Sequence, residues 1–169
     1  LALRYLDPEA YHRIASLLDG RRIDRERHIE LVKARLLESF SAAGIRAEIT
    51  GRPKHIYSIW RKMRRKNIDF HEIFVVQAVR VLVEQDADCY AVLGTVNSLW
   101  HHVPLEFDDY IANTKTNIYR YLHTEVFGPD GKPVEVQIRT REMHEHAELG
   151  IAAHWRYKEG ARYDAGFEQ

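Results

Sequence analysis

Hydrophobic residues recur at helical spacing in the first part of the chain. Asp7 followed by Pro8 is typical of a helix start, and a first helix is expected to run from there to Asp19. A second helix is expected over residues 24–43, with Gly44 at its end. The apolar face expected for this second helix consists of Ile29, Val32, Leu36, Leu37 and Phe40.

Farther along, the pattern changes to the alternation and β-branched runs that are typical of strands. The expected strands cover residues 46–50, 74–83, 118–127 and 134–139. A hairpin turn is expected at residues 128–131, and helices over residues 87–100 and from 142 towards 158. Residues 101–116 have little periodicity and are expected to form a loop. This order of elements predicts an α+β fold, in which a mostly antiparallel sheet carries helices on one side.

Residues 51–66 combine an apolar face with a cationic one. The helix is expected to begin at Pro53, because proline suits the first helical position. Its apolar face consists of Ile56, Ile59, Trp60 and Met63. Its second face consists of Lys54, Ser58, Lys62 and Arg65. A helix that follows a glycine-led turn offers free N–H groups to an anion, so a phosphate site is one interpretation. A solvated basic helix explains the pattern equally well.

Alternation in the expected hairpin separates a core face from a polar face. The residues that point inward are Ile118, Leu122, Val126, Val134, Val136 and Ile138. The residues that point outward are Tyr119, Tyr121, His123, Glu125, Glu135, Gln137 and Arg139. A carboxylate, an amide, a histidine and a tyrosine on one face suit a base and a metal. By pattern alone, an ordinary solvated sheet face is favoured over such a site.

Composition narrows the class of protein. The 169 residues suffice for one domain, or one domain plus an arm. Because 25 Lys and Arg residues balance 25 Asp and Glu residues, bulk attraction to nucleic acid is disfavoured, although the basic run 61–66 keeps RNA binding as a hypothesis. A single cysteine, Cys89, and the lack of a long apolar run predict a cytoplasmic protein without membrane contact. The start at Leu1 indicates a piece of a longer protein.

Four segments, in a fixed order along the chain, carry a resemblance to a known family. They are GRPKHIYSI at residues 51–59, DDYIA at 108–112, VEVQIRT at 134–140 and AAHWRYK at 152–158. Together they resemble the (p)ppGpp synthetase domain of the RelA/SpoT family. The resemblance implies a nucleotidyltransferase-like fold with a mixed, mostly antiparallel sheet flanked by helices. It also implies an enzyme, GTP diphosphokinase, which transfers pyrophosphate from ATP to the 3′-hydroxyl of GTP or GDP and serves the stringent response.

The same resemblance implies a division of the chain and a set of partners. Residues 1–44 would be a helical arm after a missing N-terminal domain, residues 45–158 the synthetase domain, and residues 159–169 a mobile tail. The expected partners are ATP, GTP or GDP, and other domains of the same longer chain, with ribosome and tRNA reached only through absent domains. The acidic segment 106–109, EFDD, resembles that of monofunctional RelA-type synthetases.

Site residues also follow from the resemblance. The residues implied for ATP are Arg52, Lys54, Ser58, Lys62 and Arg80. Those implied for GTP or GDP are Lys115, Tyr119, His123 and Gln137. Glu135 is implied to hold Mg²⁺, the expected cofactor, and to help to deprotonate the attacking hydroxyl.

Several positions depart from the family pattern. Val75 stands where the family has an aspartate that binds Mg²⁺, and Gln77 replaces an arginine. In the guanine segment, Ile118 replaces a glycine and Tyr121 adds a large ring. Because Mg²⁺ needs oxygen ligands that valine lacks, we expect the synthetase fold with low activity and partly retained nucleotide binding. The alternative is a catalytically weak pseudo-synthetase that binds nucleotides and serves a regulatory role.

Overall fold

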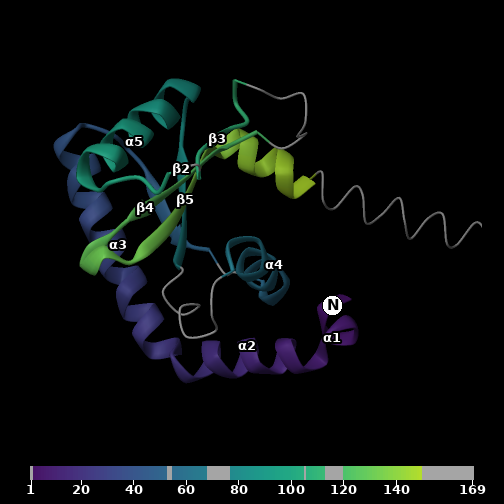
Figure 1. Cartoon of the computed structure of the whole chain (residues 1–169). Coiled ribbons are helices and arrows are strands. Elements are labelled where there is room, and N and C mark those ends of the chain that lie inside the picture. The colour runs from purple at the N-terminus through teal and green to yellow at the C-terminus, as the bar shows by residue number, and fades with distance from the viewer. Residues whose placement is uncertain (1, 53–54, 68–76, 105, 113–119, 150–169) are drawn as a thin grey trace, which may run out of the picture.

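In the part of the chain that the structure describes, one sheet of five strands organises the fold (Figure 1). This computed structural model describes residues 2–52, 55–67, 77–104, 106–112 and 120–149. The strands are β1 (Glu48–Gly51), β2 (Gln77–Val83), β3 (Asp108–Asp109), β4 (Leu122–Phe127) and β5 (Pro133–Thr140), in the order β1-β2-β5-β4-β3. β2 and β5 run parallel, whereas the other neighbouring strands are antiparallel. The predicted mixed, mostly antiparallel sheet is therefore confirmed.

Helices precede the sheet and lie between its strands in sequence. They are α1 (Ala2–Leu6), α2 (Pro8–Gly20), α3 (Arg22–Ala42), α4 (Ile56–Lys66) and α5 (Asp86–Leu99), and residues 141–149 are helical as well. α2 begins as predicted, because the Asp7 side chain accepts a hydrogen bond of 3.1 Å from the backbone N–H of Ala10. None of the helices in the described ranges is long and apolar enough to cross a membrane.

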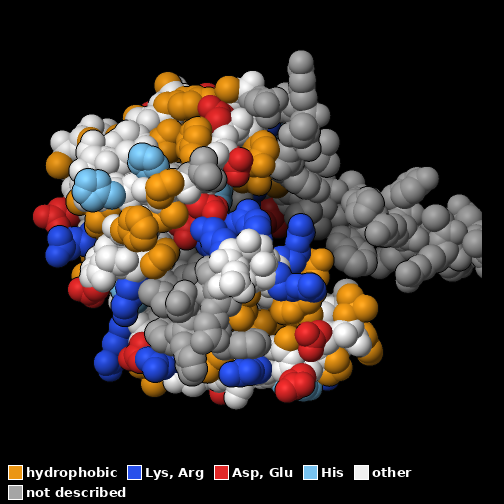
Figure 2. Space-filling view, in the orientation of Figure 1, with side chains coloured by type: hydrophobic (Ala, Val, Ile, Leu, Met, Phe, Trp, Pro, Cys, Tyr) orange, Lys and Arg blue, Asp and Glu red, His pale blue; other side chains and the backbone are white. Residues whose placement is uncertain are grey.

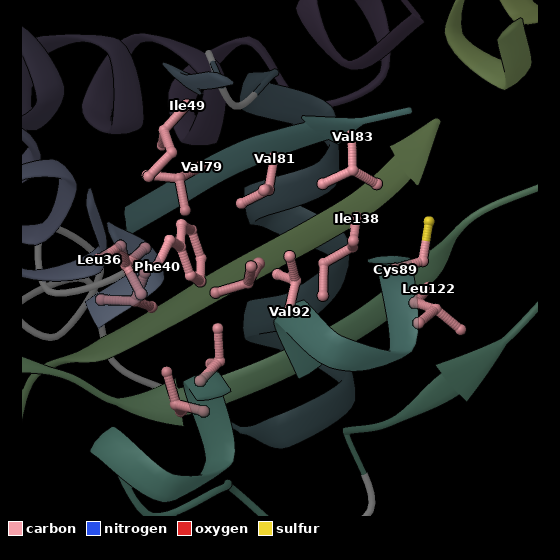
Figure 3. Close-up of a cluster of buried hydrophobic side chains, with 14 of the residues drawn as sticks. Leu36, Phe40, Ile49, Val79, Val81, Val83, Cys89, Val92, Leu122 and Ile138 are labelled. Atoms are coloured by element: carbon pink, nitrogen blue, oxygen red, sulfur yellow. The ribbon is translucent and has the colours of Figure 1, made fainter. Parts of the chain in front are cut away.

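The main hydrophobic core lies between one face of the sheet and the helices α3 and α5 (Figure 3). Phe40 of α3 and Val92 of α5 meet β-branched residues of β2 and β5 there. The buried strand residues of this core include Val79, Val81, Leu122, Val126, Val134, Val136 and Ile138. Five of these are residues that the hairpin alternation places inward, so that prediction is confirmed where the structure describes the strands; Ile118 lies outside the described residues.

Two expectations for the helices need correction, one for the apolar face of α3 and one for the start of α4. Leu37 is 44% exposed, because it lies one residue past the stripe of Val32, Leu36 and Phe40 and therefore points about 100° away from it. The helix α4 begins at Ile56 rather than at Pro53, after His55 in an extended conformation. Gly51 belongs to β1, so it does not lead directly into the helix. Pro53 itself lies outside the described residues.

Two expectations about the sheet were wrong. Part of residues 101–116 is built into the sheet, since β3 pairs with β4 and His102 forms a bridge to Val126. Such short pairing depends on distant residues and leaves no local periodicity. The helices also do not lie on one side only, because Lys62 of α4 contacts Glu125 and Glu135, which point away from the main core.

A second, smaller core joins the N-terminal helices to α4. Ile14 of α2 is fully buried against Ile59 and Met63 of α4. The partly buried residues around them are Leu17, Leu18, Ile56 and Trp60. The predicted apolar face of α4 is thus confirmed, and it is covered by the N-terminal segment rather than by the sheet.

Replacing Ile14 by alanine should lower the free energy of unfolding by about 2–5 kcal/mol, because it opens a cavity in this small core. Urea denaturation followed by circular dichroism measures the change. Ile23→Ala is a matched control, since Ile23 is 61% exposed and should change the stability by less than about 0.5 kcal/mol. Equal losses from both variants would show that α2 does not pack against α4 in this way.

Candidate active site

A cavity of about 430 Å³ lies between α4 and β5. Its lining residues are Arg52, His55, Ser58, Arg61, Lys62, Arg65 and Glu135. Figure 2 shows Lys and Arg side chains gathered on this face of the molecule, around the position of α4. Among the described residues that line the cavity, Glu135 supplies the one carboxylate. The cavity therefore suits a polyanion, which its cations can bind, and it places the carboxylate of Glu135 beside that polyanion.

The predicted second face of α4 is partly confirmed. Ser58, Lys62 and Arg65 all line the same cavity. Lys54, the fourth residue of that face, lies outside the described residues. Arg52, at the end of β1, reaches the cavity from the sheet, and its backbone N–H donates a hydrogen bond of 2.9 Å to the carbonyl of Ala78.

Lys62 lies between two carboxylates from neighbouring strands. Its Nζ donates to both carboxylate oxygens of Glu125 at 3.0 Å and to Oε1 of Glu135 at 2.8 Å. The exposed fractions are 9% for Lys62, 2% for Glu125 and 7% for Glu135. Burial disfavours the charged ammonium, but the charges and hydrogen bonds of Glu135 and Glu125 outweigh it and raise the pKa of Lys62.

The strand register explains why this lysine is needed. Glu125 of β4 lies directly opposite Glu135 of β5. Like charges in directly opposed positions of a sheet repel each other, and in a buried position the repulsion is strong. The ammonium of Lys62 contacts both carboxylates and offsets this repulsion.

Guanidinium groups gather farther along the same sheet face. Arg80 of β2 lies beside Gln137 of β5, and its Nε donates to the side-chain oxygen of Gln137 at 2.7 Å. Burial and the charge of Arg52 lower the pKa of Arg80. Burial and the charge of Arg80 lower the pKa of Arg139 to about 10. This face therefore changes from carboxylates at Glu135, through an amide at Gln137, to cations.

His123 brings the predicted guanine-side residues next to the carboxylate. It lies opposite Gln137 in the β4–β5 register, and its Nε2 is 3.9 Å from Oε2 of Glu135. Its Nδ1 is 3.9 Å from the carboxylate of Asp108. His123, Glu135 and Gln137 thus share one face, as strand alternation predicts. Lys115 and Tyr119, which the resemblance also assigns to this side, lie outside the described residues.

Side chains of the acidic segment 106–109 bind cations, a tyrosine hydroxyl and the backbone N–H groups that follow the segment. Glu106 accepts from Lys66 at 2.7 Å and from Arg65 at 3.4 Å. Burial alone would raise the pKa of Glu106, but Lys66 and Arg65 outweigh it and lower that pKa. Asp109 accepts hydrogen bonds from the Tyr90 hydroxyl at 2.9 Å and from the backbone N–H groups of residues 111 and 112.

We expect Glu106→Gln to lower the free energy of unfolding near pH 7 by about 0.5–1 kcal/mol. A carboxyl group whose pKa is lowered by folding stabilises the protein above its unfolded pKa, and this contribution is lost as the pH falls through the folded pKa. The difference from the unmodified chain should therefore shrink as the pH falls from about 7 to about 3. Urea denaturation at several pH values tests this, and a difference that grows on acidification would contradict it.

The residues present fit a divalent cation only together with a nucleotide. Mg²⁺ is usually held by one or two carboxylates plus substrate phosphates and water. Glu135 lines the cavity, and two carboxylates, those of Glu125 and Glu135, contact the ammonium of Lys62. Within the described part of the chain, no group of three or more His, Cys, Asp or Glu side chains is arranged to hold a metal ion. Val75, where the resemblance leads one to expect a carboxylate, lies outside the described residues.

Sequence reasoning missed part of the site. Strand alternation places Glu125 on the polar face, but only the register of β4 against β5 puts it opposite Glu135, where two carboxylates repel each other unless a cation lies between them. Arg61 and His55 also line the cavity and were not assigned to it. The basic run 61–66 contained the signal for Arg61, but the sequence alone did not show which of its side chains turn toward the sheet.

Comparisons with known proteins agree with this geometry. Residues 51–162 match the family model described as "Region found in RelA / SpoT proteins". The GTP pyrophosphokinase of Escherichia coli K12 is 59% identical over 158 residues, which are 94% of this chain and 21% of that protein. The bifunctional (p)ppGpp synthase/hydrolase RelA of Mycobacterium tuberculosis is 47% identical over 159 residues, which are 94% of this chain and 22% of that protein. The chain therefore spans about a fifth of the length of these relatives.

A solved structure with a similar fold is small alarmone synthetase 1 of Bacillus subtilis, bound to its product pppGpp. It aligns with a TM-score of 0.60 and 25% identity, over 82% of this chain and 81% of that one. The family model covers more than half of the chain, and its residues include the whole wall of the cavity from Arg52 to Glu135. On these grounds, the chain belongs to the RelA/SpoT family.

Proposed function

We propose that this chain is the (p)ppGpp synthetase domain of a longer protein and transfers pyrophosphate from ATP to the 3′-hydroxyl of GTP or GDP. The observation that carries the proposal is the cationic cavity with Glu135 in its wall. A nucleoside triphosphate needs several cations, and the attack of a hydroxyl needs a nearby base. The names of the relatives, GTP pyrophosphokinase and (p)ppGpp synthase/hydrolase, support the same reaction.

In this proposal ATP lies in the cavity with its phosphates along α4. Ser58 and Lys62 contact the phosphates, together with Lys54, and Arg65 lies at the same wall. The guanidinium group of Arg65 suits a phosphate contact, because guanidinium groups donate paired hydrogen bonds to phosphate oxygens. Arg52 and Arg80 hold the adenine by stacking on its faces. The register of β1 against β2 supports this, because Arg80 lies opposite Thr50, two residues before Arg52.

The guanine nucleotide lies on the other side of Glu135. His123 and Gln137 flank Glu135 on the sheet face and orient the acceptor, with Lys115 and Tyr119 as further contacts. Glu135 accepts the proton of the 3′-hydroxyl while the 3′-oxygen of the guanine nucleotide forms a bond to the β-phosphorus of ATP. The bond between that phosphorus and the α–β bridging oxygen breaks, and AMP leaves. Mg²⁺, when it is bound by Glu135 and the phosphates, supplies charge neutralisation.

We propose that this reaction is slow, because Val75 offers no oxygen ligand to the metal. With one carboxylate in the cavity wall, the cation is held mainly by the nucleotide, and poor positioning costs rate steeply. Ile118 and Tyr121 add a second handicap on the guanine side. A pseudo-synthetase that binds nucleotides for a regulatory purpose is the second candidate. The engagement of Lys62 by two carboxylates favours it, since a phosphate must displace them.

The remaining proposals concern the whole protein. The synthetase domain is assigned to residues 45–158, and α3, which precedes them, takes part in the same main core. The acidic segment 106–109 supports a RelA-type branch. Ribosome and tRNA would be reached through other domains, and the protein would be cytoplasmic.

An assay of AMP and (p)ppGpp formation from ATP with GDP or GTP in Mg²⁺ tests the proposed function. The expected result is slow formation of AMP and (p)ppGpp in equal amounts. Formation of AMP without (p)ppGpp would indicate hydrolysis instead of transfer. Nucleotide binding without any product, at enzyme concentrations near those of the substrate, would favour the pseudo-synthetase.

A further inference from the structure

We propose that Glu125 competes with the nucleotide phosphates for Lys62, and that it thereby sets the affinity of the cavity for ATP. This inference rests on the proposed function of the cavity. Glu125 is not among the described residues that line the cavity. It acts through Lys62 and is a positioning residue.

The hydrogen bonds of Lys62 carry the argument. A lysine ammonium has three N–H donors and no acceptor. The structure gives three contacts from Lys62 Nζ to carboxylate oxygens, two to Glu125 and one to Glu135. All the contacts that the structure gives for this ammonium are therefore made to carboxylates. A phosphate oxygen gains a hydrogen bond from Lys62 only if at least one of these contacts is given up.

Glu125 is the carboxylate whose contacts compete most directly. It makes two of the three contacts, and it is less exposed than Glu135, with exposed fractions of 2% and 7%. When Lys62 turns toward a phosphate, Glu125 loses its bonds and stays buried next to the like charge of Glu135. Leaving a buried carboxylate without its cation is costly, and this cost is subtracted from the binding free energy of the nucleotide.

The neutral variant Glu125→Gln should remove this cost. Glutamine has nearly the same size and fits the buried position, but it carries no charge and offers Lys62 one acceptor oxygen instead of two. At least one donor of Lys62 is then available to a phosphate, and Glu135 no longer faces a second carboxylate. The variant should therefore bind ATP more tightly than the unmodified chain.

Isothermal titration with ATP, once with Mg²⁺ and once with EDTA, tests the inference. We expect a Kd about tenfold lower for Glu125→Gln than for the unmodified chain, because charge-assisted hydrogen bonds no longer compete. Glu84→Gln is the matched control: it removes the same charge from an exposed residue that pairs with Arg141, away from the cavity, and should leave the Kd unchanged. An unchanged or higher Kd for Glu125→Gln would overturn the inference.

A second measurement uses the unmodified chain and does not depend on the folding of a variant. ATP binding should shift the carbon-13 resonance of the Glu125 carboxylate, although Glu125 does not line the cavity. Saturation with ATP without such a shift would overturn the inference and leave the proposed function standing. A folded chain and a folded Glu125→Gln variant that both fail to bind ATP would overturn the inference together with the proposed function.

Discussion

Replacing Glu135 by glutamine should lower the rate of (p)ppGpp formation by about 100- to 10,000-fold, the usual contribution of a general base. Glutamine keeps the shape of the side chain but does not accept the proton of the 3′-hydroxyl. Glu135 is the carboxylate in the cavity wall and lies within 3.9 Å of His123, so among the described residues it combines access to the nucleotide with basicity. Lys62 keeps Glu125 as a partner in this variant, and the fold should survive.

This loss is best measured in a background that has appreciable activity. The proposed choice is Val75→Asp, compared with the double variant that also carries Glu135→Gln. Glu84→Gln in the same background is the control, since it removes an exposed carboxylate that pairs with Arg141 and does not line the cavity. If Glu135→Gln retained most of the rate while ATP binding was unchanged, Glu135 would not be the base.

Introducing aspartate at position 75 should raise the rate of (p)ppGpp formation by about 100-fold, because poor positioning in a catalytic site typically costs that much. The resemblance to the RelA/SpoT family places a metal-binding aspartate at this position, and Val75 offers no oxygen. The gain should depend on Mg²⁺, and it should appear in kcat more than in the KM for ATP, since the cationic wall already holds the phosphates.

Val76→Asp is the matched control for this gain. It adds the same charge one residue away, at a position to which the family pattern gives no metal ligand. Equal gains from Val75→Asp and Val76→Asp would indicate a general charge effect. No gain from Val75→Asp would show that Ile118 and Tyr121, rather than the missing carboxylate, limit the rate.

The core could be predicted from the sequence because its signals are local. Alternation along residues 134–139 places Val134, Val136 and Ile138 inward, and helical spacing places Val32, Leu36 and Phe40 on one stripe. The error at Leu37 shows the limit of such reasoning, since a hydrophobic residue beside a stripe can be exposed. Which face of the sheet α4 covers was not predictable, because the decisive contacts join residues far apart in the chain.

The candidate site was predictable in its composition but not in its pairing. Strand parity and the resemblance together place Glu135, Gln137 and His123 on one face, and the structure has them there. The sequence assigns Lys62 to phosphate binding, whereas in the structure its donors go to Glu125 and Glu135. That arrangement needs the register of β4 against β5 and the approach of α4, which local patterns do not contain.

A crystal structure of the chain with a non-hydrolysable ATP analogue, GDP and Mg²⁺ tests the central claim most directly. We expect the triphosphate in the cavity between α4 and β5, in contact with Ser58 and Lys62, with the 3′-hydroxyl of GDP within hydrogen-bond distance of Glu135. A triphosphate bound elsewhere would contradict the proposed site, for example in a separate cavity that Arg25 and Lys132 help to line.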